Sequence, residues 1–105
     1  MKVTDFDPAD YLTTKEVMVE YLNEALKTSI KDNAPEHFMQ ALGDVTRAQG
    51  ITNAAKATEL NREHLYRSLS QKGNPAFSTI IKLIKFLDLD INITESKSAK
   101  TAIAL

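Results

Sequence analysis

The sequence predicts an all-α fold, a small domain of about five helices that ends in a short C-terminal strand. Three patterns predict it. Apolar residues recur at spacings of three and four through the first half of the chain. Two much shorter helical stretches follow Gly50 and are separated by a tight turn. Near the end, "LDINIT" alternates apolar and polar residues, which is typical of a strand. A length of 105 residues indicates one domain with a modest core.

The first helix is predicted from about Thr14 to about Thr28. Thr13 and Glu16 have the spacing of a capping box, and Thr14 is the rival N-cap. Its apolar face holds Met18, Tyr21, Leu22, Ala25 and Leu26. This face has two interpretations: it packs on the domain core, which is the default, or it is part of a docking surface for a partner. The ten residues before it are acidic and predict an extended arm.

A second helix is predicted from about Pro35 to about Gln49. Proline suits the first position of a helix, and Asn33 is a candidate N-cap. Gly50 is a natural C-terminal stop. The apolar face is formed by Phe38, Leu42 and Val45, with Met39 and Ala41 beside it.

The helices then shorten. Thr52 is expected to cap a stretch from Asn53 to about Thr58, and Glu59 and Leu60 form a tight turn. Asn61 is expected to cap a helix that runs to about Ser70. "QKGNP" then predicts a turn, because Gly and Asn tolerate positive φ and Pro75 disfavours helix in the residue before it.

The last helix begins at Phe77 or Ser78 and reads "STIIKLIKFLD". Its inward residues are predicted to be Ile80, Ile81, Leu83, Ile84 and Leu87. The strand that follows carries Leu89, Ile91 and Ile93 on one face, and it needs a partner strand from a second copy or another protein. The chain therefore divides into an acidic arm and first helix (1–33), a helix-turn-helix domain with the strand (34–95), and a weakly patterned tail (96–105).

Two short helices joined by a tight turn inside an all-helical domain predict a helix-turn-helix, whose second helix enters the major groove of DNA. Leu65 and Leu69 are expected to anchor that second helix to the core. At about 100° per residue, Arg67 falls opposite these leucines and Tyr66 lies on the flank. Arg62 lies nearer the leucine side, but it starts the helix, and the start of a recognition helix is the end that meets base edges.

The predicted base-reading residues are Arg62, Glu63, Tyr66 and Arg67. Arginine forms paired hydrogen bonds with guanine O6 and N7, while Glu63 accepts from cytosine N4 or orients Arg67. Tyr66 touches a thymine methyl group or a phosphate. The predicted contacts to the DNA backbone are Thr52, Asn53, Asn61, Ser70 and Lys72. The competing interpretation is a solvated helix face on which Glu63 and Arg67 form a weak ion pair.

Charge is unevenly distributed along the chain. The whole carries a net charge of −1, but residues 1–46 carry −5 and residues 47–72 carry +3. Positive charge therefore gathers where the helix-turn-helix is predicted, and the acidic first third suits a basic partner.

Other functions find little support in the sequence. The chain has no cysteine, and His37 and His64 lie far apart, so no metal site is predicted. It has no Ser in a nucleophile-elbow context and no Gly-rich phosphate loop, so no cofactor or catalytic residue is predicted. No apolar run is long enough to span a membrane, and a cytoplasmic protein, on the nucleoid when bound to DNA, is expected.

The run "GITNAAKATELNREHLYRSLSQKGNPAFSTIIKLIKFLDLDI" resembles the Xre/Cro-like helix-turn-helix family. More narrowly, the chain resembles the antidote (antitoxin) proteins of chromosomal toxin–antitoxin addiction modules over almost its full length, most specifically from "LYRSLS" to "GNP". The resemblance implies a lambda-repressor-like fold, a homodimer on double-stranded operator DNA, and neutralisation of a RelE/ParE-like toxin. This chain departs from the family pattern in two places, with Glu59 where Gly is usual and Asn53 where Gln is commoner.

The function expected is a DNA-binding autorepressor that is also an antitoxin. The alternative is a protein-interaction module without DNA binding, which the acidic first third supports. An enzyme is a distant third.

Overall fold

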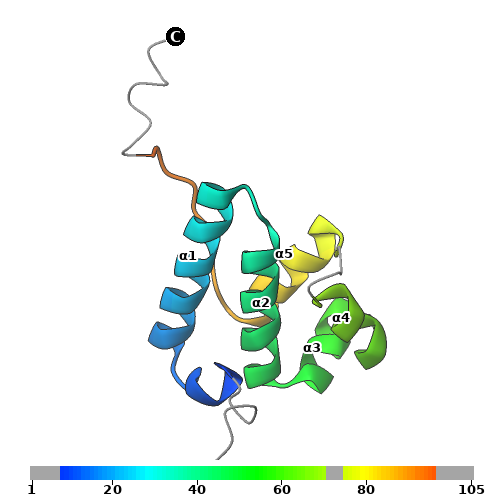
Figure 1. Cartoon of the computed structure of the whole chain (residues 1–105). Helices are drawn as coiled ribbons and strands as arrows, with labels where there is room; N and C mark the ends of the chain where they lie inside the picture. The colour runs from blue at the N-terminus through cyan, green and yellow to red at the C-terminus, as the bar shows by residue number, and fades with distance from the viewer. Residues whose placement is uncertain (1–7, 71–74, 97–105) are drawn as a thin grey trace, which may run out of the picture.

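The computed structural model describes residues 8–70 and 75–96, which form a short 3-10 helix and five α-helices. The elements are η2 (Pro8–Tyr11), α1 (Lys15–Asp32), α2 (Glu36–Gln49), α3 (Ile51–Thr58), α4 (Arg62–Ser68) and α5 (Phe77–Phe86). In Figure 1, α1 and α2 form an antiparallel pair, with α3, α4 and α5 grouped on the other side of α2. The predicted all-α class is confirmed.

Helix α1 begins where the sequence places it and ends one turn later than predicted. Thr14 rather than Thr13 is the N-cap, because its Oγ1 accepts a 3.2 Å hydrogen bond from the amide of Val17. Asn33 adopts left-handed φ (54°) and ends α1, so it is not the N-cap of α2. Ser29, which is buried near the end of α1, caps the start of α2 instead: its Oγ accepts a 2.8 Å hydrogen bond from the amide of Phe38.

Gly50 joins α2 directly to α3. Its φ of 112° is open to glycine but not to residues with a Cβ, and its N–H donates to the carbonyls of Thr46 and Arg47. Its own carbonyl accepts from Ala54, which starts the next helix without a linker. Helix α3 therefore begins at Ile51, and Thr52, predicted as its cap, lies inside the first turn.

The core lies where all five helices meet. Leu42 and Val45 of α2, Leu65 of α4 and Leu83 of α5 have no exposed surface. Helix α1 adds Met18 and Leu22, and α3 adds Ala54. Leu12, between η2 and α1, is also buried, although no periodicity in the sequence pointed to it.

Two predictions about apolar and N-terminal positions are wrong. Ile81 was predicted to face inward but is 46% exposed, because Ile80 and Ile84 of the same helix turn toward the core and leave it on the solvent side. Pro8–Tyr11 is a turn of 3-10 helix rather than part of an extended arm. The rest of the predicted arm lies outside the described residues.

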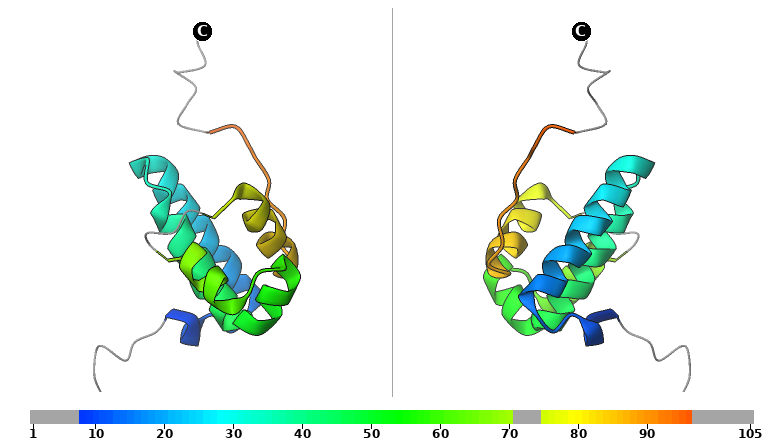
Figure 2. Two further views of the ribbon diagram at one scale, coloured as in Figure 1. Left: turned by 90° about the vertical axis from the view of Figure 1, so that its right-hand side faces the viewer. Right: turned by 90° about the vertical axis from the view of Figure 1, so that its left-hand side faces the viewer.

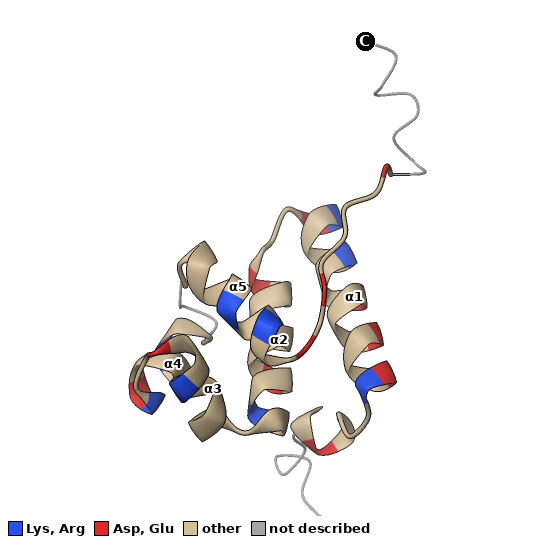
Figure 3. Ribbon diagram, turned by 180° about the vertical axis from the view of Figure 1, so that it is seen from behind, with Lys and Arg blue, Asp and Glu red and all other residues tan. Residues whose placement is uncertain are grey.

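The predicted C-terminal strand is wrong. Residues 89–94 form no strand, since the described residues offer no second strand for them to pair with. Instead, Asp88 takes left-handed φ (60°) after α5, and the chain crosses back toward α1, as Figure 3 shows. The side views in Figure 2 show the same segment rising past α5. Leu89 packs against the core, while Ile91 is 49% and Ile93 is 92% exposed.

Among the described residues, no helix combines the length and the apolar character needed to cross a lipid bilayer.

Candidate nucleic-acid interface

The turn between α3 and α4 is short and held from both sides. Glu59 ends α3 in the left-handed region, with φ of 63° and ψ of 24°. The amide of Leu60 then donates back to the carbonyl of Ala55 at 3.1 Å, and the Glu59 carboxylate lies 3.5 Å from the ammonium of Lys82 on α5. Glutamate thus adopts the conformation for which the resembled family uses glycine, at a steric cost.

Helix α4 is capped at its start and anchored by its leucines. The Oδ1 of Asn61 accepts a 2.7 Å hydrogen bond from the amide of His64, so the predicted N-cap is confirmed. Leu65 and Leu69 are both buried. A Cβ on Gly43 of α2 would lie 3.3 Å from the carbonyl oxygen of Leu69, so glycine there allows the end of α4 to approach α2 closely.

The structure leaves the four predicted base-reading side chains in solvent. Arg62, Glu63, Tyr66 and Arg67 are all exposed. Glu63 and Arg67 lie opposite the leucines, whereas Tyr66 lies on the flank and Arg62, the first residue of α4, lies nearer the leucine side. Glu63 and Arg67 form no ion pair with one another, unlike other pairs among the described residues. Both guanidinium groups of α4 therefore remain available to a ligand.

The residues predicted to contact the DNA backbone fall into three groups. Thr52 and Asn53 are exposed in the first turn of α3. Asn61 and Ser70 are also exposed, but each already makes a local hydrogen bond: Asn61 caps α4, and the hydroxyl of Ser70 donates to the carbonyl of Arg67 at 2.8 Å. Lys72 lies outside the described residues.

A buried polar cluster next to this surface was missed from the sequence. The Asp44 carboxylate is 5% exposed and accepts hydrogen bonds from the Tyr21 hydroxyl and the Arg47 guanidinium, each at 2.5 Å. Arg47 is partly exposed and lines a cavity of about 310 Å³ that Tyr66 and Ser70 also line. The three-residue spacing of Asp44 and Arg47 in a helix was the signal that could have revealed the pair.

Most of the chain matches one known protein family. Residues 2–95 match the model of a family described as "Probable addiction module antidote protein". This chain belongs to that antidote family. Membership gives the chain a role in a toxin–antitoxin system and implies a toxin as its partner.

The chain is also similar to a curated protein. The chain is 40% identical over 98 residues to an uncharacterized protein of Haemophilus influenzae (strain ATCC 51907 / DSM 11121 / KW20 / Rd), and the match covers 93% of this chain and 97% of that one. No solved structure matches the chain.

The described residues of this antidote protein contain no group of three or more His, Asp or Glu side chains that could hold a metal ion. His37 is placed beside Asp32 at 3.7 Å, a pairing of two surface side chains between the end of α1 and the start of α2.

Proposed function

We propose that this antidote protein is an autorepressor that binds its own operator as a homodimer through a lambda-repressor-like helix-turn-helix formed by α3 and α4. In the same proposal it neutralises a RelE/ParE-like toxin in the cytoplasm. The observation that carries the DNA-binding part is the α4 edge. Arg67 is exposed opposite the completely buried Leu65, Tyr66 is exposed on the flank, and Arg62 is exposed at the start of the helix.

The dimensions of α4 suit a major groove. Its seven residues span roughly 10 Å at 1.5 Å per residue, and the major groove of B-form DNA is about 12 Å wide. Entered from its N-terminal end, the helix would present Arg62 first and Tyr66 one turn later. Thr52 and Asn53 would meet the phosphates at the start of α3, where backbone amides and the helix dipole favour an anion.

Gel retardation with the DNA upstream of the protein's own gene tests this proposal. We expect wild-type protein to retain this DNA at physiological salt and to release random duplex. Arg67→Ala should weaken retention by about 10- to 100-fold, since a paired arginine–guanine contact is worth about 1–3 kcal/mol. Lys31→Ala removes one positive charge from the far end of α1 and should change retention much less.

Equal affinity of the wild type for operator and random duplex would defeat the DNA-binding proposal. The second candidate, a protein-interaction module without DNA binding, would then stand, because residues 1–46 carry a net charge of −5. That candidate predicts that Arg62→Ala and Arg67→Ala leave every activity intact. Loss of operator retention in either variant, with fold and partner binding unchanged, rules the second candidate out.

The antitoxin part of the proposal has its own test. Toxin and antitoxin are expected from neighbouring genes, and a small basic protein encoded next to this chain is the expected partner. Co-expression of the two should give a stable complex and relieve the growth arrest that the neighbouring protein causes when expressed alone. Growth arrest that persists despite co-expression would contradict the antitoxin role for this gene pair.

A further inference from the structure

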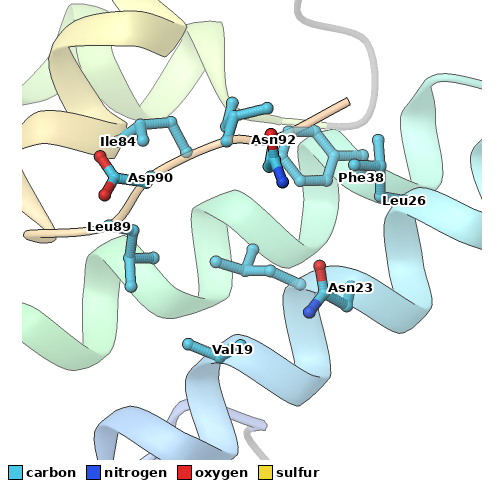
Figure 4. Close-up of a pocket in the computed structure, with 10 residues that line it drawn as sticks. Val19, Asn23, Leu26, Phe38, Ile84, Leu89, Asp90 and Asn92 are labelled. Carbon is cyan, nitrogen blue, oxygen red and sulfur yellow. The ribbon is translucent and has the colours of Figure 1, made fainter. Parts of the chain in front are cut away.

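A groove lies between α1 and the segment that follows α5, on a part of the surface to which α3 and α4 contribute nothing. The side chains that form its floor are apolar and come from α1, α2, α5 and the following segment: Leu22, Leu26, Phe38, Ile84 and Leu89. Val19 and Ile91 stand at its two edges and are 37% and 49% exposed. Figure 4 shows these side chains converging from α1 on one side and residues 89–92 on the other. We call this hollow the α1 groove.

The size of the α1 groove suits one inserted side chain. Its cavity measures about 120 Å³. A cavity of about 150 Å³ lined by Leu, Ile and Phe holds one benzene molecule, so the α1 groove matches a single leucine or phenylalanine side chain. Such pockets take the anchor residues that dominate protein–protein binding energy.

The edges of the groove are acidic. On the helical projection of α1, Glu16 and Glu20 lie next to Asn23, which lines the groove, and Asp90 stands on the opposite wall. Figure 3 shows acidic positions along the α1 ribbon and on the segment after α5. Glu16, Glu20 and Asp90 make no ion pair with the described residues.

The nearby lysines do not cancel this charge. The ammonium of Lys15 lies 3.3 Å from the carboxylate of Asp88, and that of Lys27 lies 3.8 Å from Glu24. Each of these two cations therefore already has an acidic neighbour. Lys85 lines an adjacent hollow together with Asp90, but this one cation does not offset the carboxylates of Glu16, Glu20 and Asp90, so the edges of the groove keep a net negative charge.

From these features we propose that the α1 groove is the docking site for the toxin, and that it receives one apolar side chain flanked by lysines or arginines. The inference rests on the proposed antitoxin function and adds the surface that performs it. A basic partner complements the acidic edges, which speeds encounter and selects the partner. The α4 edge stays uncovered in this arrangement, so one molecule could hold toxin and operator together.

A second copy of the chain is a poorer occupant. A two-fold contact through the same groove would bring the acidic edges of the two molecules together, and like charges facing each other across an interface are unfavourable. Nucleic acid is excluded by the same negative charge.

A pair of matched substitutions on α1 tests the proposal. Val19 at the groove edge and Val17 on the far side of the helix are 37% and 40% exposed, so each should accept arginine without loss of fold. Binding is measured by calorimetry between the full-length chain and the purified product of the neighbouring gene. Val19→Arg should raise the Kd by about tenfold or more, since it blocks an anchor pocket and adds a repelling charge, while Val17→Arg should change it by less than about threefold.

The controls separate this proposal from the antitoxin function itself. Thermal unfolding and operator retention of both variants should equal those of the wild type. If the wild type binds the neighbouring protein and both arginine variants bind equally well, the groove assignment is overturned while the antitoxin function stands. If the wild type forms no complex, the antitoxin function for this gene pair falls and the groove assignment falls with it. If the protein without its partner is a dimer, and Val19→Arg but not Val17→Arg converts it to a monomer, the groove binds a second copy of the chain instead.

Discussion

The hydroxyl of Tyr21 on α1 donates a 2.5 Å hydrogen bond to the carboxylate of Asp44 on α2. Asp44 is buried, and Arg47, one turn further along α2, donates to its other oxygen. A buried carboxylate needs such donors, because leaving one unsatisfied costs free energy. The bond therefore adds a directional link to the apolar contact between the two longest helices.

Removal of the Tyr21 hydroxyl should destabilise the protein. Tyr21→Phe keeps the ring and deletes one donor to a buried charge, so the free energy of unfolding should fall by about 1–3 kcal/mol. Urea denaturation followed by circular dichroism measures it. Tyr66→Phe, on an exposed tyrosine, is the matched control and should change stability by less than about 0.5 kcal/mol. Equal effects of the two substitutions would show that the Tyr21–Asp44 bond adds nothing.

The left-handed conformation of Glu59 predicts an unusual order of stabilities. Glu59→Gly and Glu59→Ala both delete the ion pair with Lys82, but only glycine enters the left-handed region without a Cβ clash. We expect the glycine variant to be more stable than the alanine variant by about 1 kcal/mol. At an ordinary helical position the order is reversed. An alanine variant as stable as the glycine variant would mean that the turn relaxes when Glu59 is replaced.

Asn61 should separate stability from DNA binding. Asn61→Ala removes the cap of α4 and should cost about 1 kcal/mol of unfolding free energy, whereas Asn61→Asp keeps an acceptor for the amide of His64. The aspartate variant should stay close to wild-type stability yet bind operator more weakly, because it places a negative charge beside the phosphates. Thermal unfolding and gel retardation on the same samples check both halves. An Asn61→Asp variant with unchanged operator affinity would place Asn61 away from the DNA backbone.

Gly50 should not tolerate a side chain. With φ of 112°, Gly50→Ala forces a strained backbone at the junction of α2 and α3, and a loss of about 1–3 kcal/mol is expected. Gly43→Ala is the comparison, since Gly43 lies within α2, where alanine is favoured over glycine. That gain offsets part of the cost of a Cβ placed 3.3 Å from the Leu69 carbonyl oxygen. Thermal melts should therefore rank Gly50→Ala below Gly43→Ala, and the reverse order would argue against strain at the junction.

Features set by neighbours in the chain were predictable from sequence. The helices, the cap at Asn61, the stop at Gly50 and the inward leucines of α4 all follow from spacing and side-chain chemistry within a few residues, whereas the choice between Thr13 and Thr14 as the first cap did not. Asn33 shows where such reasoning fails: the residue suits the end of one helix as well as the start of the next. Ser29 decided between the two roles by bonding to Phe38, nine residues away.

The sequence by itself determined the helical class, the order of the helices and the outward edge of α4, because helix periodicity and capping act within one or two turns. Only the tertiary structure decided that Ile81 faces solvent, that residues 89–94 cross toward α1 without pairing, and that Asp44 is buried between two donors. The α1 groove likewise exists only after folding, since Val19, Phe38 and Leu89 come from separate parts of the chain. Burial depends on what the rest of the chain places against a residue, and no local pattern contains that information.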